Sequence, residues 1–189
     1  MKKILFIFLL SVTVNCFSQN DLTSIQEINF YGVDFSHANL FGLEESPGTI
    51  KSGLVRINDL FISEMKKYDI SRYFKKGVLN YCLKATDENN DKIVVGRLVS
   101  EAPFVELSED EISGVLASLD CKDGNGVGLV FIAENLNKPR KTASYIVAFF
   151  DESTKRVLYK KSVSGKPFGF GIRNFWAGSI FQIMKNWKY

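Results

Sequence analysis

Histidine, cysteine and proline are scarce in this chain of 189 residues, which has one, three and four of them respectively. A single histidine leaves a zinc site short of ligands, because the three cysteines lie far apart and form no paired motif. Beyond the N-terminal residues no apolar run is long enough to span a membrane, and the chain has no internal repeat or low-complexity tract. These absences argue against a zinc centre, an integral membrane protein and a repeat protein.

The N-terminus has the three parts of a secretory signal peptide. A basic start is followed by the largely apolar residues 4–14 and by the polar-to-small residues 15–18. We therefore predict that 1–18 is a signal peptide, removed after export across the inner membrane. A lipoprotein signal with Cys16 as the lipidated residue is the alternative, but Asn15 stands where that processing requires a small residue. We expect a periplasmic or extracellular protein without a lipid anchor.

The charge of the mature chain is close to neutral. The whole sequence has a formal net charge of +3, and loss of Lys2 and Lys3 with the signal leaves +1. Binding to nucleic acid through the overall charge is therefore not expected. Residues 19–189 fit one domain with a single core. Cys82 and Cys121 remain, and their spacing leaves open whether they form a disulfide or stay as buried thiols.

The C-terminal third carries the densest apolar pattern. Residues 126–135, 142–152 and 156–163 read as three strands, and residues 172–187 as a helix with apolar residues every three or four positions. In 142–152 both faces are apolar, which predicts a central strand, whereas 156–163 alternates and predicts an edge strand. We expect residues 27–36 to form a first, buried strand.

The middle of the chain gives weaker signals. Apolar spacing predicts a helix beginning at Gly53, a short helix over 70–76 capped by Asp69 or Ser71, and a helix over 109–119 that begins with a capping box at Ser108. Residues 37–49 read as a loop, 78–86 as a strand, 87–91 as a polar turn and 91–100 as a return strand. The fold class predicted is α+β, a mostly antiparallel sheet with about three helices packed on it.

Asp34, Ser36 and His37 invite comparison with a hydrolase. On a strand, Asp34 and Ser36 share one face and His37 points to the other, which is unsuited to a Ser-His-Asp relay. We interpret His37 as a residue of the turn that ends the strand. A hydrolase-like enzyme using Asp34 and His37 is the third of our functional hypotheses.

Residues 87–98 fail as a calcium loop, because Lys92 replaces the required glycine and Leu98 stands at the bidentate position. The glycine-rich elbow 165–174 lacks the spacing of a P-loop and of a dinucleotide fingerprint. No metal and no cofactor are predicted.

The elbow nevertheless keeps a functional possibility. Its backbone N–H groups and basic residues could hold an anion, although the same glycines could serve only close packing of the helix on the sheet. A small apolar ligand could bind among Phe168, Phe170, Phe175 and Trp176. The candidate binding residues are Lys166, Gly169, Gly171, Arg173, Asn174 and Trp176.

Basic residues accumulate toward the C-terminus. Between Lys138 and Lys188 eleven lysines and arginines stand against two acids. A basic face that includes Lys160 and Lys161 would suit an anionic partner or contact with a membrane surface. The alternative is ordinary solvated surface, on which exposed charges contribute little.

Two stretches carry a family resemblance. The segment FDEST at 150–154 followed by VLYKKSVSGKPFGFGIRNFWA, together with FYGVDFSHA at 30–38, resembles secreted proteins of unknown function common in Bacteroidota. The resemblance implies secretion and no assigned activity. In architecture alone, the order of strands and helices is similar to periplasmic accessory domains of the TolB N-terminal and curli-secretion type.

The failed catalytic motifs, the export signal and the segregated charge favour a non-enzymatic, envelope-associated interaction domain with a protein partner. A protein that binds a small ligand or an anion at the Gly165–Asn174 elbow is the second hypothesis.

Overall fold

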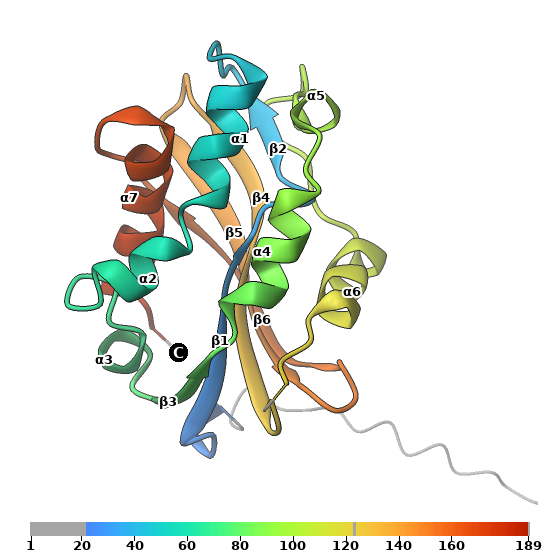
Figure 1. The fold of residues 1–189 in the computed structure, drawn as a ribbon, viewed down its shortest axis with the longest axis vertical. Helices are drawn as coiled ribbons and strands as arrows, with labels where there is room; N and C mark the ends of the chain where they lie inside the picture. Colours follow the sequence, from blue (N-terminus) through green and yellow to red (C-terminus); the bar gives the residue numbers. More distant parts are fainter. Residues whose placement is uncertain (1–21, 123, 189) are drawn as a thin grey trace, which may run out of the picture.

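Six strands form one mixed sheet with helices on both of its faces (Figure 1). The structure is a computed structural model that describes residues 22–122 and 124–188, so the predicted signal peptide lies outside the described residues. The strand order is β3–β1–β4–β5–β6, and β2 pairs with β4. The strands are β1 (Glu27–Asp34), β2 (Asn39–Phe41), β3 (Gly77–Tyr81), β4 (Val127–Asn137), β5 (Thr142–Asp151) and β6 (Val157–Gly165).

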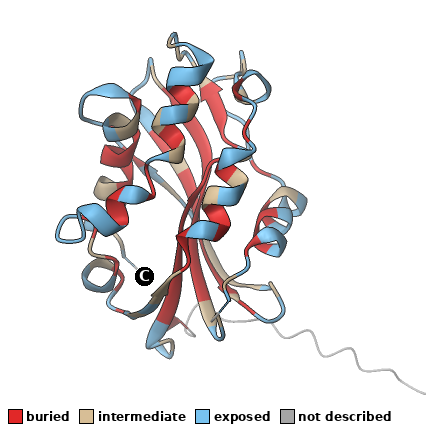
Figure 2. Ribbon diagram, in the orientation of Figure 1, coloured by how far each residue is buried: buried red, intermediate tan, exposed pale blue. Residues whose placement is uncertain are grey.

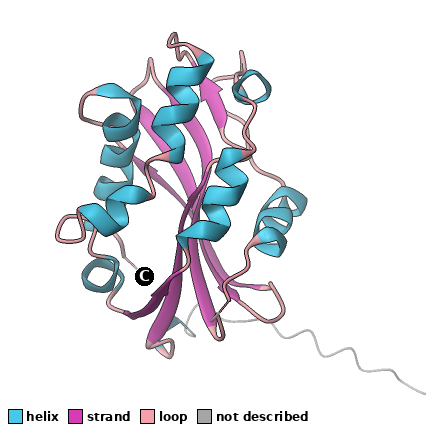
Figure 3. Cartoon of the chain, viewed as in Figure 1, coloured by secondary structure: helices cyan, strands magenta, loops and turns pink. Residues whose placement is uncertain are grey.

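The described residues also form seven helices, more than the three expected (Figure 3). The α+β class and the single domain are confirmed. The helices are α1 (Pro47–Val55), α2 (Asp59–Ser63), α3 (Ile70–Phe74), α4 (Leu83–Asp91), α5 (Val95–Leu98), α6 (Glu109–Ser118) and α7 (Gly171–Lys185).

The sheet is less antiparallel than expected. Its two longest ladders, β4–β5 and β5–β6, are antiparallel, but β1 pairs in parallel with β3 and β4, and β2 in parallel with β4. Helices lie in the chain between β1 and β3, between β1 and β4, and between β2 and β4, and such crossovers allow the paired strands to run parallel.

Two apolar clusters hold the layers together. On one face Phe131, Val147 and Phe149 pack with the buried residues of α1, α2, α3 and α7. On the other face Ile146 and Phe150 pack with α6. Figure 2 shows that β5 is buried along nearly its whole length. The predictions of a central β5, an edge strand β6 and a buried stripe on the last helix are confirmed.

Four of the expectations for the middle of the chain were wrong. The predicted loop 37–49 contains β2 and the start of α1, where Ser46 accepts a hydrogen bond from the Thr49 N–H. The predicted strand 78–86 ends at Tyr81, and the predicted turn 87–91 belongs to helix α4. The predicted return strand 91–100 forms the short helix α5 instead.

Other local predictions are confirmed. Asp69 caps α3 by accepting from the Arg72 N–H, and the capping box of α6 is complete between Ser108 and Glu111. Cys82 and Cys121, left open by the sequence, form a disulfide with Cα atoms 5.6 Å apart. The disulfide ties the N-terminus of α4 to the segment after α6.

A bulge in β1 is filled by asparagine side chains. Gly32 has φ +78°, and a Cβ there would lie 2.6 Å from Asn58 Oδ1. Asn58 Oδ1 accepts from the Val33 N–H at 2.8 Å, and Asn90 Oδ1 accepts from the Phe35 N–H at 2.7 Å. The amide groups of Asn58 and Asn90 both donate to the Val33 carbonyl. The bulged backbone therefore finds its partners in side chains rather than in a neighbouring strand.

The turn between β5 and β6 is held by the FDEST segment. Asp151 Oδ1 accepts from the Thr154 N–H at 2.7 Å and from the hydroxyls of Ser153 and Thr154. Glu152 turns inward, where Tyr31 and Asn29 donate to its carboxylate at 2.6 and 2.8 Å. This segment thus has a structural role at both of its acids.

Replacement of the buried amide in the β1 bulge should be costly. We expect Asn58→Ala to lower the free energy of unfolding by about 2–4 kcal/mol, because it leaves the buried Val33 N–H without its acceptor. Urea unfolding measures this. The exposed Asn186→Ala is the control and should change stability by no more than about 0.5 kcal/mol. Equal effects of the two changes would contradict this account of the bulge.

Two acids should affect stability with opposite signs. Burial raises the pKa of Asp87, so its ionisation destabilises the fold at neutral pH. Hydrogen bonds from Ser153 and Thr154 lower the pKa of Asp151 to about 2, so its charge stabilises the fold above the unfolded pKa of about 3.9.

We therefore expect Asp87→Asn to raise the melting temperature at pH 7, with the gain shrinking as the pH falls toward about 4. Asp151→Asn should lower the melting temperature at pH 7, with the loss shrinking as the pH falls toward about 2. Thermal melts of both variants and the parent across this pH range test the signs. Shifts of the same sign at pH 7 would refute the assignment.

Candidate functional site

The first turn of α7 lies directly against α1. A Cβ on Gly53 would be 2.4 Å from the Ile172 side chain and 3.2 Å from the Arg173 backbone nitrogen. Only glycine at position 53 allows this approach without a shift of the helices. The N-terminus of α7 is thereby fixed beside the outer surface of α1.

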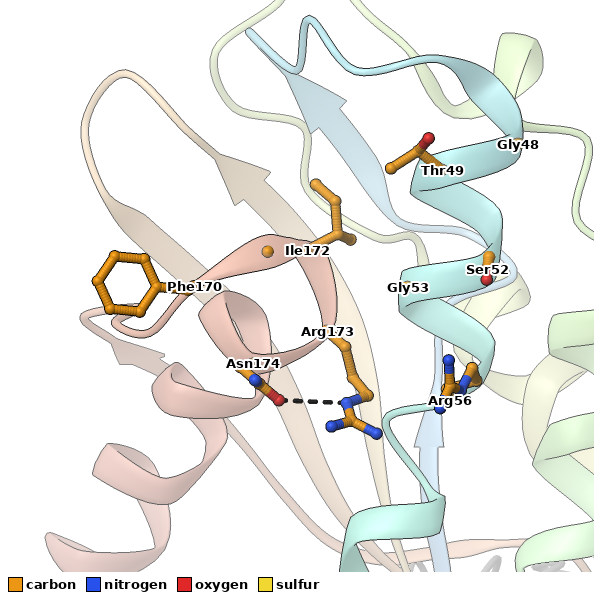
Figure 4. Close-up of a pocket in the computed structure, with 10 residues that line it drawn as sticks. Gly48, Thr49, Ser52, Gly53, Arg56, Phe170, Ile172, Arg173 and Asn174 are labelled. Carbon is orange, nitrogen blue, oxygen red and sulfur yellow. Dashed lines mark hydrogen bonds between the residues drawn. The ribbon is translucent and has the colours of Figure 1, made fainter.

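A groove of about 520 Å³ opens between these two helices (Figure 4). One wall comes from α1 and its C-terminal end, and the other from the elbow and the first turn of α7. None of the ten described residues that line the groove is acidic. They are Gly48, Thr49, Ser52, Gly53, Arg56, Phe170, Gly171, Ile172, Arg173 and Asn174.

Two arginines face each other across the groove. Arg56 follows α1 as its C-cap, and Arg173 belongs to the first turn of α7. In Figure 4 both guanidinium groups extend into the space between the helices. Arg173 Nε donates to Asn174 Oδ1 at 3.1 Å. Within the described part of the chain, neither arginine belongs to an ion pair.

The helix terminus adds to this positive potential. The N-cap of α7 is Phe170, which offers no side-chain acceptor, and the first turn contains no acid. Backbone N–H groups at a helix N-terminus lack intrahelical partners and carry a partial positive charge. Arg173 therefore stands at the end of the helix where a cation is least favourable. An anion in the groove would offset this repulsion between the arginine and the helix terminus.

Glycine is required in and beside the elbow for two different structural reasons. A Cβ at Gly165 would lie 2.2 Å from the Ser179 carbonyl oxygen, and one at Gly178 would lie 2.3 Å from the Phe168 carbonyl oxygen. These two glycines permit close packing of α7. Gly169 and Gly171 instead adopt φ of +115° and +72°, a region that favours glycine. Gly171 borders the groove, and a Cβ there would meet no atom within 4 Å.

The structure brings together some of the predicted binding residues. Gly171, Arg173 and Asn174 line the groove, whereas Lys166 and Gly169 are exposed on the elbow outside it. Trp176 is fully buried in the core and lies outside the groove. The polar lining residues that the sequence did not indicate are Thr49, Ser52 and Arg56. Thr49 belongs to the stretch that was read as a loop, and Arg56 was expected only on the polar face of a helix.

The four elbow aromatics do not surround one pocket. The Phe175 and Trp176 rings pack against each other at 4.9 Å, and Phe168 packs on Phe181 at 6.3 Å. Phe170 alone borders the groove, and it is 94% exposed. The expected aromatic ligand pocket is therefore not formed by these rings.

Lys160 and Lys161 are neighbours on β6 and so point to opposite faces of the sheet. Lys160 pairs with Glu109 of α6. Lys161 donates to the Lys188 carbonyl at 2.9 Å and lies 5.5 Å from the Trp187 ring centre, on the side of α7. The two lysines therefore do not share one basic face.

The segment after β1 does not form a catalytic relay. Ser36 Oγ donates to the buried Asp34 carboxylate at 2.5 Å, so its proton is directed away from His37. His37 Nδ1 lies 3.7 Å from Glu111 Oε1 of α6, at the edge of a cavity of about 220 Å³. Glu111 is itself engaged in the capping box, and hydrogen bonds from Ser108 lower its pKa. This geometry pairs the histidine with an acid, and the two serines that line the same cavity donate elsewhere, Ser36 to Asp34 and Ser118 to the Val115 carbonyl.

Comparison with known proteins adds nothing to this geometry: no protein-family model, curated protein or solved structure matches the chain. Over residues 22–122 and 124–188, no cluster of three or more potential metal ligands is found. In the same residues, none of the helices has both the length and the apolarity needed to cross a membrane.

Proposed function

We propose that this protein is a non-enzymatic binding domain of the cell envelope that holds an anionic group in the groove between α1 and α7. The observation that carries the proposal is the pair Arg56 and Arg173, which converge from two helices on a groove with no acidic lining residue. The envelope location rests on the signal peptide predicted from the sequence.

The groove offers the donors that an oxyanion needs. Guanidinium groups bind carboxylate and phosphate through paired N–H donors. The hydroxyls of Thr49 and Ser52 lie along the α1 wall, and the N-terminus of α7 contributes its partial positive charge. The groove has a volume of about 520 Å³, which leaves room for a ligand or partner larger than one phosphate.

An enzymatic role finds less support. A catalytic role for His37 requires a nucleophile or a substrate-facing acid beside it, and the nearest acid is shared with the α6 capping box. The α1–α7 groove contains arginines and hydroxyls but no general base.

An anion should stabilise the folded protein through the two arginines. We expect inorganic pyrophosphate to raise the melting temperature of the protein, because ligand that binds only the folded state stabilises it by mass action. Arg56→Gln combined with Arg173→Gln should abolish this rise. Thermal melts at constant ionic strength measure it, and chloride at equal ionic strength corrects for screening.

Arg97→Gln is the matched control, since Arg97 is an exposed arginine on α5 and lies outside the groove. It should respond to pyrophosphate as the parent does. A parent protein that pyrophosphate does not stabilise, or a double variant that it stabilises equally, would overturn the groove as an anion site.

A further inference from the structure

Phe170 is the most exposed large apolar residue among those described, at 94%. It stands at the tip of the elbow, next to the groove, and Figure 4 shows its ring pointing away from α1. Phe168, two residues earlier in the same elbow, is 43% exposed. One aromatic ring fully in water has no role in the core of this domain.

The elbow holds Phe170 outward in a defined conformation. Gly169 and Gly171, on either side of it, adopt positive φ, and the Phe168 N–H donates to the Phe175 carbonyl at 3.2 Å. Close packing of Gly178 against the Phe168 backbone fixes the elbow to α7. The ring is therefore presented by an ordered turn, and its ordering costs little further entropy when it is covered.

Basic residues lie near this ring in the sequence and in the adjoining groove. From Ser153 to the last residue the chain contains eight lysines and arginines and no aspartate or glutamate. Lys166 is exposed on the same elbow, and Arg173 lies three residues after Phe170. Arg56 adds a third cation from α1 at the groove.

We propose that the elbow docks on an anionic phospholipid surface, with Phe170 entering the boundary between headgroups and acyl chains and a lipid phosphate occupying the Arg56–Arg173 groove. The proposal rests on the proposed function and names the source of the anion. A projecting aromatic ring beside cations suits a membrane surface, where negatively charged headgroups lie over apolar acyl chains. A protein partner would instead have to supply both a pocket for the ring and an acid for the groove.

Vesicle co-sedimentation tests the proposal. The mature protein is mixed with vesicles of phosphatidylcholine and phosphatidylglycerol in a ratio of about two to one, and with vesicles of phosphatidylcholine alone. We expect binding to the anionic vesicles, little binding to the neutral ones, and weaker binding as salt increases. Phe170→Ser should reduce the affinity for anionic vesicles about tenfold or more, through the loss of apolar burial.

Phe104→Ser is the matched control, because Phe104 is 59% exposed but lies outside both the elbow and the groove. It should bind as the parent does. Phe170→Trp gives a direct readout of insertion: its fluorescence, after subtraction of the parent signal, should shift to the blue with anionic vesicles and be quenched by brominated acyl chains. Circular dichroism confirms that each variant is folded.

The outcomes separate this proposal from the anion site. If pyrophosphate stabilises the protein but anionic vesicles do not bind it, the anion site in the groove stands and the lipid proposal fails. The anion would then come from a soluble phosphate compound or from an acid of a protein partner. Equal binding to neutral vesicles, an unshifted emission spectrum of the Phe170→Trp variant, or equal losses for Phe104→Ser and Phe170→Ser would each overturn the lipid surface. Failure with both pyrophosphate and vesicles overturns both proposals.

Discussion

The contact between the β1 bulge and the side chains of Asn58 and Asn90 positions the helices on one face of the sheet. A bulged strand cannot satisfy its own N–H and C=O groups through its neighbours, and buried groups of this kind must find other partners. Asn58 comes from the junction of α1 and α2, and Asn90 from α4. By supplying these partners, the two asparagines fix where α1 ends and where α4 lies. The α1 wall of the groove depends on this arrangement.

The same contact explains why half of the fold was predictable and the middle was not. Strands β4 to β6 and helix α7 bury apolar stripes, and these leave a periodic signal in the sequence. Helix α4 instead turns Thr86 and Asn90 toward β1, and Asp87 accepts a hydrogen bond from Asn58. A helix that buries polar side chains has no apolar stripe, so its sequence reads as a polar turn. Only the position of the bulge in the folded chain reveals its partners.

One wall of the candidate site could likewise be predicted from the sequence and the other could not. The elbow was recognisable from its glycines and basic residues, because backbone freedom and charge are properties of a local segment. Its partner wall was not, since Arg56 joins Arg173 only through the crossing of α1 and α7 at Gly53. Nothing near Arg56 in the sequence indicates that crossing. Trp176 was expected both on the buried stripe of the last helix and among the binding residues. Its full burial agrees with the first expectation and contradicts the second.

The elbow glycines can serve both the close packing of α7 and the binding of an anion, because different glycines have the two roles in this fold. Gly165 and Gly178 bring α7 close enough to the sheet and the elbow to bury Trp176. That close docking forces the chain through a sharp turn, which Gly169 and Gly171 accommodate with positive φ. The turn leaves Phe170 at the N-cap, where a polar residue would otherwise satisfy the first N–H groups of the helix. The uncapped terminus and the exposed elbow residue therefore arise from a single packing solution, and Arg173 adds a cation at the same terminus. A ligand that is both anionic and apolar would offset these unfavourable features together.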